Sequence, residues 1–265
     1  MKLSIVILHT NDKLIFQTLE SVFKTVKTEF ECILVDNHTN QQQYDEIKKK
    51  YPQIKTIQNP ANYGYARGIN VGLKQAKGDF ILALNPDIIV FDNTIDAMII
   101  YMEKNKDVAI LGPQLVNVDK TLQYSCRRFP QLSTMLFRRG PFKNNVKKAI
   151  AEYEMHDIDH KKIQEVEWMC GGFLLIKNEV FQKIGFMDEF YFLYFDDVDF
   201  CRRAHTVGKI VYYPESEAIH AASYESKKKL IPLLIHLRSM CYYFFKIHLF
   251  PKWNLTKWSG WHKQP

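Results

Sequence analysis

The sequence predicts an α/β protein with a doubly wound, mostly parallel sheet that carries helices on both faces. Two observations support this fold class. Short β-rich runs alternate with segments of helical periodicity through the first hundred residues. The chain has 265 residues and is 46% hydrophobic, which is enough to bury one large core or two halves that share a cleft.

The alternation consists of strand and helix pairs, followed by a less regular second half. The predicted strands are Leu3–Leu8, Glu31–Val35, Ile54–Gln58, Phe80–Leu84, Val108–Leu111, Trp168–Ile176 and Ile210–Tyr213, the last one ending at Pro214. The predicted helices are Leu14–Val26, Tyr44–Lys50, Ala66–Ala76, Ile95–Lys104, Glu179–Ile184 and a segment from about Asp197 to Thr206. We interpret the basic, poorly periodic segment Arg127–Lys148 as an acceptor-side insertion or mobile loop.

Polar residues follow the predicted parallel strands. Ligands of such sheets bind beyond the carboxyl ends of the strands, so these residues are candidates for ligand contact. They are Thr10 and Asn11 after the first strand, Asp36 and Asn37 after the second, Asn59 to Asn62 after the third, and Asn85 to Asp87 after the fourth.

Charge is distributed unevenly along the chain. The formal net charge is +7, from 36 basic and 29 acidic residues. No acidic residue follows Glu225, so the whole positive excess belongs to the C-terminal tail, and we expect no nucleic-acid partner. The basic residues of the tail are Lys227, Lys228, Lys229, Arg238, Lys246, Lys252, Lys257 and Lys263.

The cysteines and the N-terminus favour a reducing compartment. The first apolar run, which ends at Leu8, is too short for a signal peptide, and we interpret it as a core strand. The five cysteines form no CxxC pair and leave one over from any complete disulfide set, so they also give no indication of a zinc site. They are Cys32, Cys126, Cys170, Cys201 and Cys241.

Asp87 is the first candidate for chemistry, because it ends the run Leu82-Ala83-Leu84-Asn85-Pro86-Asp87. A carboxylate at this edge of the sheet can hold a divalent ion against a diphosphate, since Mg²⁺ uses few protein carboxylates together with phosphate oxygens and water. Asn, Pro and Asp are also ordinary residues of a turn that ends a strand. Taken alone, this run favours the turn.

Three carboxylates, Asp196, Asp197 and Asp199, lie at the start of a predicted helix behind an aromatic run. Neighbouring negative charges raise a carboxyl pKa and a helix N-terminus lowers it, so the cluster can be tuned to accept a proton near neutral pH. The alternative is helix capping by Asp196 or Asp197, with Asp199 paired to Arg202 or Arg203. Both can hold together.

Glycines mark two further candidate segments. The run from Asn62 to Gly72 matches neither GxGxxG nor a P-loop, and it places backbone and Arg67 at a helix N-terminus, where a phosphate or ribose could bind. Its glycines would equally permit close contact between helix and sheet. Gly171 and Gly172 interrupt a predicted strand, which allows close approach of a ligand or forms a bulge.

His220 follows a β-like run and precedes small residues. A lone histidine after a strand is more often a hydrogen-bonded structural residue than a ligand. Only a pairing with Asp87 would change that interpretation.

Taken together, these segments resemble the family 2 glycosyltransferases with the GT-A fold, especially the bacterial branch that includes many rhamnosyltransferases. The resemblance spans about Leu3 to Ser226 and depends on the order of its segments. These are the opening strand, Val35-Asp36-Asn37, the Asn62, Gly64 and Asn70 segment, Asn85-Pro86-Asp87, Cys170-Gly171-Gly172, Asp196-Asp197-Val198-Asp199, and His220 with Ser226.

The resemblance implies inverting sugar transfer from a UDP- or dTDP-sugar to a lipid-linked or growing surface glycan, with Mg²⁺ or Mn²⁺ as cofactor. Asp87 and His220 would hold the metal, Asp197 would be the general base, and Asp196 and Asp199 would orient the acceptor or the base. The implied donor site consists of Thr10, Asn11, Asp36, Asn62, Gly64, Arg67, Asn70, Asn85, Gly171 and Gly172. Residues 1–112 would form the nucleotide-sugar-binding half of the GT-A domain, 113–226 its acceptor-binding and catalytic half, and 227–265 a helical, basic and aromatic tail.

The sequence departs from the family pattern at two positions. Asn85 stands where the family often has Asp, which leaves the metal site with one charge less. Asp196 stands where the family often has Glu, and its side chain is one methylene shorter. The pattern therefore distinguishes less clearly between Asp196 and Asp197 as the base, and we assign the role to Asp197.

The tail is interpreted as a surface anchor on an anionic membrane. The apolar stretch Ile231–Leu249 is interrupted by Pro232, His236, Arg238 and Lys246, so it is not a credible bilayer span. Trp253, Trp258, Trp261 and the lysines favour the membrane surface, which predicts a cytoplasmic protein bound peripherally to the inner membrane. The alternative is a helix docked on the catalytic body.

Other functions fit the residues less well. A nucleotidyltransferase or a dinucleotide-dependent oxidoreductase should carry a glycine-rich phosphate loop after the first strand, and the residues His9 to Asp12 form no such loop. A non-catalytic protein that binds sugar nucleotides or nucleic acid would explain the basic tail but leave the carboxylate cluster without a role.

Overall fold

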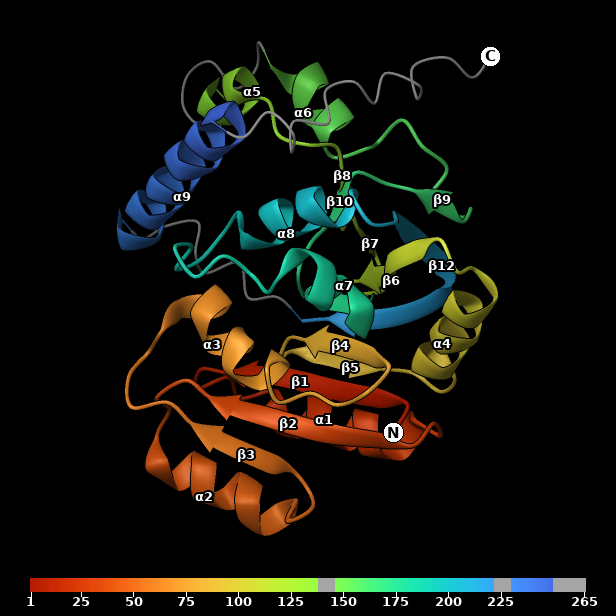
Figure 1. The fold of residues 1–265 in the computed structure, drawn as a ribbon, viewed down its shortest axis with the longest axis vertical. Coiled ribbons are helices and arrows are strands. Elements are labelled where there is room, and N and C mark those ends of the chain that lie inside the picture. The colour runs from red at the N-terminus through yellow and green to blue at the C-terminus, as the bar shows by residue number, and fades with distance from the viewer. Residues whose placement is uncertain (138–145, 222–229, 250–265) are drawn as a thin grey trace.

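The computed structural model describes residues 1–137, 146–221 and 230–249. Its centre is a ten-stranded mixed sheet (Figure 1). Helices cover both faces of this sheet, so the predicted α/β class is confirmed.

The first half of the sheet is parallel, as predicted. Its strands are β1 (Leu3–His9), β2 (Phe30–Asp36), β3 (Lys55–Gln58) and β4 (Phe80–Leu84). The connecting helices are α1 (Ile15–Thr25), α2 (Gln41–Lys50) and α3 (Gly64–Leu73). The carboxyl ends of β1, β2 and β4 therefore meet at one edge.

The second half of the sheet is mixed. The strand β11 (Phe173–Lys177) lies antiparallel between β4 and β6 (Val108–Val116), and β12 (Lys209–His220) is parallel to β6. A short strand that the sequence did not indicate, β5 (Ile88–Val90), lies antiparallel to β12. The smaller strands are β7 (Leu122–Gln123), β8 (Cys126–Arg127), β9 (Gln164–Glu165) and β10 (Trp168–Met169). Eight strands of the sheet have the order β3-β2-β1-β4-β11-β6-β12-β5, and the other two, β7 and β9, pair with β6 and β12.

Alternation along the strands divides the core between the two faces of the sheet. In β1, Val6 and Leu8 face a cluster with α3, α7 (Asn178–Ile184) and α8 (Asp196–Ala204). Leu3, Ile5 and Ile7 face a second cluster with α1, α2 and α4 (Thr94–Lys104). Successive side chains of a strand point to opposite faces, so continuous apolar strands are required for this two-sided burial.

Three predicted strands have clearly different bounds in the structure, and one of them is β6, which continues past the predicted end at Leu111 to Val116. The predicted strand Trp168–Ile176 is broken at Gly171 and Gly172, because β10 pairs with β8 in a separate two-stranded sheet and only β11 joins the main one. The predicted end at Pro214 is wrong, since β12 continues to His220. A register shift between Tyr213 and Glu217 absorbs the proline, as a β-bulge does.

The basic segment predicted as a loop is partly helical where it is described. It contains α5 (Leu132–Phe137), and α6 (Lys147–Tyr153) overlaps its end. Residues 138–145 of that segment lie outside the described residues.

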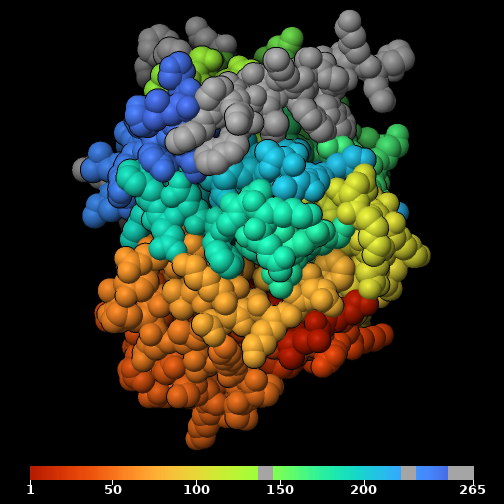
Figure 2. Space-filling view, viewed as in Figure 1, coloured from red at the N-terminus to blue at the C-terminus, as the bar shows by residue number. Residues whose placement is uncertain are grey.

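The helix α9 (Leu230–Leu249) docks on the α/β body through one face. Met240 and Tyr243 are buried in the core, and Ser239 Oγ donates a hydrogen bond to the Leu193 carbonyl. Figure 2 shows α9 in blue beside the teal part of the chain. Pro232 is accommodated because it lies in the first helical turn, where a missing N–H costs nothing.

No helix in residues 1–137, 146–221 or 230–249 is long and apolar enough to cross a membrane. The tryptophans and the other lysines of the predicted tail, from Lys227 to Lys229 and after Phe250, lie outside the described residues.

Candidate active site

Asp87 and His220 meet at the edge of the sheet because β5 and β12 pair. His220 lies opposite Ile88 in the antiparallel register, and the Ala221 amide donates to the Asp87 carbonyl. This places His220 Nε2 3.4 Å from Asp87 Oδ1. The pairing that would change the interpretation of a lone histidine is therefore present.

The turn that carries Asp87 is fixed from both sides. Thr18 Oγ1 on α1 donates to the Pro86 carbonyl at 2.7 Å, and the Asn85 amide donates to the Gly172 carbonyl at 2.9 Å. The second bond links the Asn85–Asp87 turn directly to the glycine pair.

Gly171 and Gly172 connect the two groups of candidate residues. A Cβ at Gly172 would lie 3.5 Å from His220 Cε1 and 3.4 Å from Asn85 Nδ2, whereas a Cβ at Gly171 would lie 3.3 Å from Asp197 Cβ. Adjacent residues thus contact the Asp87–His220 pair on one side and Asp197 on the other. A Cβ at Gly171 would come closer to Asp197 than most Cβ contacts do, whereas one at Gly172 would make ordinary van der Waals contact, so the close approach that favours glycine is at Gly171.

Asp197 lies at the N-terminus of α8, and its carboxylate accepts hydrogen bonds from two backbone amides. The Gly171 amide donates to Oδ2 at 3.0 Å, and the Val198 amide donates to Oδ1 at 2.9 Å. Burial raises the pKa of Asp197 although these amides and the Arg127 guanidinium lower it. An oriented carboxylate with a raised pKa suits proton acceptance near neutral pH.

Asp196 and Asp197 differ in their access to solvent. Asp196 is buried, while Asp197 is half-buried. Burial, and then the charge of Asp197, raises the pKa of Asp196 well above its ordinary value. The residues before them, Tyr194 and Phe195, both have positive φ, so the chain reaches α8 through two left-handed residues.

Asp199 points away from these carboxylates into the α9 contact. Its Oδ2 pairs with Arg203 Nε at 2.9 Å, and its Oδ1 pairs with Lys246 Nζ at 2.7 Å. Lys246 also pairs with Asp188 at 2.7 Å. Both oxygens of Asp199 are therefore used in buried ion pairs, which is the structural alternative that the sequence left open.

The donor-site candidates of the Asn62–Gly72 segment have mixed positions. Asn70 is buried and binds the Met187 backbone through both amide atoms, so it holds the loop before α8 rather than facing solvent. Gly64 has a φ of +75° and lies against Phe192. Gly68 and Gly72 allow α3 to contact β1, because a Cβ there would lie 2.8 Å from Leu8 and 2.5 Å from Val6.

The backbone amides at the start of α3 have protein partners. The amides of Tyr63, Gly64 and Tyr65 donate to Asn37 Oδ1, Asn62 Oδ1 and the Phe192 carbonyl. These three amides are thus not available to a phosphate. The exposed Arg67 is still available for the predicted contact with a phosphate or ribose. Its guanidinium stacks on the Tyr63 ring at 4.0 Å.

The remaining donor-site candidates lie at the ends of β1 and β2. Thr10 and Asn11 are exposed, and Asn11 Oδ1 accepts a hydrogen bond from the Asn40 amide. Asp36 is buried opposite His9 in the register, and its carboxylate accepts bonds from the hydroxyl and amide of Thr39.

Three residues at this edge were missed by sequence reasoning. Burial raises the pKa of Asp12, and the charge of Asp87 raises it further, so Asp12 lies within electrostatic reach of the Asp87–His220 pair. Tyr65 OH donates to the Gly171 carbonyl, and Gln123 contacts His220 Nδ1. Asp12 directly follows the polar residues after β1 and could have been found there, whereas no local signal marks Gln123.

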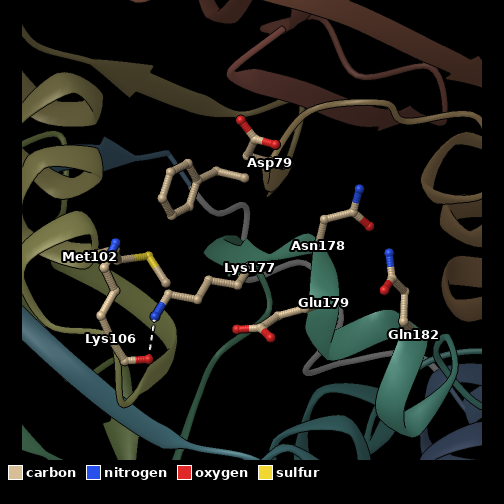
Figure 3. A pocket seen from close by; sticks show the side chains of 8 residues that line it. Asp79, Met102, Lys106, Lys177, Asn178, Glu179 and Gln182 are labelled. Carbon is tan, nitrogen blue, oxygen red and sulfur yellow. Dashed lines mark hydrogen bonds between the residues drawn. The ribbon is translucent and has the colours of Figure 1, made fainter.

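A cavity of about 400 Å³ lies at the opposite edge of the sheet. Figure 3 shows its lining, where Lys177 Nζ donates to the Lys106 carbonyl. It borders Asp79 and Phe80 at the start of β4, while Asp87 follows the end of that strand. This cavity is therefore separate from the candidate active site.

A sequence model described as Glycosyl transferase family 2 matches residues 4–199, which cover most of the chain and include the Asn85–Asp87 turn, the glycine pair and Asp197. The chain belongs to this family. The family match agrees with the resemblance found in the sequence.

Two relatives identify the branch of family 2. The chain is 24% identical over 249 residues to the N-acetylglucosaminyl-diphospho-decaprenol L-rhamnosyltransferase of Mycobacterium tuberculosis, covering 88% of this chain and 77% of the relative. It is 26% identical over 234 residues to the rhamnosyltransferase WbbL of Escherichia coli, covering 84% of each. This family 2 chain is therefore rhamnosyltransferase-like.

A solved structure supports the fold. The family 2 chain superposes on GalNAc-T7, crystallised with UDP, GalNAc and Mn²⁺, with a TM-score of 0.64 at 19% identity. The match covers 85% of this chain and 44% of that one. The predicted GT-A fold is thereby confirmed.

Proposed function

We propose that this family 2 glycosyltransferase moves one sugar, with inversion, from a UDP- or dTDP-sugar to a lipid-linked or growing surface glycan such as O-antigen or capsule. The observation that carries the proposal is the glycine pair, which brings Asp197 and the Asp87–His220 pair together across two adjacent residues. A single displacement needs a base on one side of the anomeric carbon and stabilisation of the leaving diphosphate on the other.

Asp197 is the proposed general base. It is half-buried and oriented by two amides, so its carboxylate can accept a proton without reorganising. As the acceptor oxygen forms its bond to the anomeric carbon, its proton passes to Asp197. The bond from that carbon to the diphosphate oxygen breaks, and its electron pair leaves with the nucleoside diphosphate.

The residues at Asp87 fit a divalent cation. Asp87 Oδ1 is buried, has no hydrogen-bond partner among the described residues, and faces His220 Nε2 at 3.4 Å. The described residues contain no cluster of three or more His, Cys, Asp or Glu that could hold a metal, so phosphate oxygens and water would complete the coordination. A bound Mg²⁺ or Mn²⁺ would supply positive charge beside the leaving diphosphate.

The donor and acceptor are proposed from the relatives and the chain's own residues. The names of both relatives specify rhamnosyl transfer, and one specifies an acceptor with a diphospho-decaprenol lipid, so we propose rhamnose as the sugar and a lipid-linked glycan as acceptor. Thr10, Asn11, Asp36 and Arg67 are the proposed donor contacts that lie at the sheet edge or are exposed beside it.

A lipid-linked acceptor implies that transfer takes place at a membrane surface. We propose a cytoplasmic protein that is bound peripherally to the membrane through its tail. The exposed residues of α9 are largely apolar, with Ile231 71% exposed and Phe245 61% exposed, and they also include Arg238 and His248. No acidic residue follows Glu225, so the charge of this region suits anionic lipid. Lys246, however, is buried between Asp188 and Asp199 and does not contribute to that surface.

A transfer assay tests the proposal. Purified protein is incubated with Mg²⁺ or Mn²⁺ and a panel of uridine, thymidine and guanosine diphosphate sugars, and hydrolysis or transfer is measured. Turnover of one donor, lost on addition of chelator, is the expected result. Binding of a donor without turnover of any would instead support a non-catalytic sugar-nucleotide-binding protein.

A further inference from the structure

Gln123 makes three polar contacts, two of them with His220. Its Nε2 donates to the His220 carbonyl at 2.7 Å and to Asn117 Oδ1 at 2.7 Å, and its Oε1 lies 3.0 Å from His220 Nδ1. Gln123 lies on β7, which pairs with β6 beside β12. It therefore reaches His220 from a strand that carries none of the family's ordered segments.

These contacts determine the orientation of the Gln123 amide. The amide nitrogen has two acceptors, so both of its hydrogens are used and Oε1 must face the histidine. An amide oxygen only accepts hydrogen bonds. His220 Nδ1 must therefore be the protonated nitrogen that donates to it.

The other ring nitrogen then has a lone pair. In a neutral imidazole with its proton on Nδ1, Nε2 is an acceptor, and it faces the buried Asp87 Oδ1 at 3.4 Å. Two acceptors that face each other are unfavourable unless a proton or a metal cation lies between them, and a divalent cation would satisfy both. Metal-binding histidines commonly have this arrangement, with the remote N–H held by an oxygen of the protein.

We infer that Gln123 is a positioning residue that fixes the tautomer and ring orientation of His220 so that Nε2 is available to a divalent cation. This inference rests on the proposed metal site of Asp87 and His220. Gln123 itself would touch neither the cation nor the sugar nucleotide.

A purely structural role is the competing explanation. The Nε2 bonds of Gln123 also tie β7 to the Asn117 side chain and to the end of β12, which could be their whole purpose. The two roles depend on different atoms. The positioning role needs Oε1, and the structural role needs Nε2, so substitutions can separate them.

The experiment measures Mn²⁺ affinity by the electron paramagnetic resonance signal of free Mn²⁺, with UDP present, for the full chain. Gln123→Leu removes both functions, and Gln123→Glu keeps an acceptor oxygen while losing the donor. We expect Gln123→Leu to weaken Mn²⁺ binding by about 10- to 100-fold. Gln123→Glu should restore most of that affinity even where its melting temperature without metal is lower than that of the wild type.

A second readout reports the tautomer directly. At a pH where the imidazole is neutral, ¹⁵N chemical shifts distinguish a proton on Nδ1 from one on Nε2. The wild type should carry the His220 proton on Nδ1 in the absence of metal. In Gln123→Leu, Nε2 should carry it, because Asp87 Oδ1 is then the nearest acceptor.

Asp87→Ala separates failure of this inference from failure of the metal site. Loss of Mn²⁺ affinity in Asp87→Ala but not in Gln123→Leu would overturn the inference and leave the metal site standing. Equal loss in Gln123→Leu and Gln123→Glu, with the Nδ1 tautomer unchanged in both, would assign Gln123 a structural role only. Unchanged affinity in Asp87→Ala would overturn the metal site itself.

Discussion

The Gly171 amide donates a hydrogen bond to Asp197 Oδ2 at 3.0 Å and thereby orients the proposed base. The two glycines therefore have separable roles. Gly171 lies against the proposed base, and Gly172 lies against His220, although the two residues are adjacent.

Alanine substitutions at the two glycines should have different kinetic effects. A Cβ at Gly171 would lie 3.3 Å from Asp197 Cβ and shift the carboxylate, so Gly171→Ala should lower kcat with little change in donor KM. The loss should be roughly 10- to 100-fold, the effect of a small misplacement of a reacting group. Gly172→Ala is the matched control, since its Cβ would make only ordinary van der Waals contact with Asn85 and His220 and should leave kcat near the wild-type value. Identical kinetics for the two variants would contradict this division.

The buried Asp196 carboxyl should lower the free energy of unfolding as the pH rises. The folded-state pKa of Asp196 is raised by burial and by Asp197, so the stability it contributes is complete below its unfolded pKa and is lost as the pH rises through the folded pKa. Asp196→Asn removes this dependence. Urea unfolding between pH 5 and pH 8 should show the variant gaining stability over the wild type towards pH 8. A constant difference across this range would contradict the raised pKa.

Lys246 should stabilise the contact between α9 and the catalytic body. It lies between Asp188 and Asp199 and is largely buried, so Lys246→Met leaves two carboxylates without this partner. The free energy of unfolding should fall by about 3 kcal/mol, as for removal of one partner from a buried ion pair. Lys183→Met, which breaks an exposed pair with Glu179, should cost less than about 1 kcal/mol. Equal costs in urea unfolding would mean that Lys246 is not a buried anchor.

Removal of the residues after Phe250 should weaken binding to anionic membranes. The segment contains Lys252, Lys257 and Lys263, and each lysine near an anionic surface contributes about 1 kcal/mol. Sedimentation with phosphatidylglycerol vesicles should fall in the truncated protein and should already be low with phosphatidylcholine vesicles. Unchanged sedimentation with the anionic vesicles would dismiss the anchor.

The sequence was most informative where a residue's environment is local. The apolar strands β1, β2 and β4 and the helices between them follow from apolar runs and helical periodicity, because these strands are almost entirely buried and each helix buries one face. The docked α9 was left open as one of two alternatives. The short β5 gave no signal, since its three residues directly follow the Asn85–Asp87 turn and are ordered only by pairing with β12.

The candidate site shows the same limit. The proximity of His220 to Asp87 depends on β12 continuing past Pro214. Proline usually ends a central strand because it cannot donate a backbone hydrogen bond, but a β-bulge accommodates it here. Asn70 and Asp199 resemble functional residues in their segments, yet their partners, Met187 and Lys246, lie far away in the sequence. Long-range partners of this kind cannot be inferred from local pattern.

Transfer and donor binding by Asp197→Asn test the central claim most directly. Asparagine keeps the size of the side chain but cannot accept the acceptor's proton, so transfer should fall by roughly 10²- to 10⁴-fold. Metal-dependent donor binding, measured by thermal shift, should remain at the wild-type level. Full transfer activity in Asp197→Asn would contradict the assignment of this carboxylate as the base.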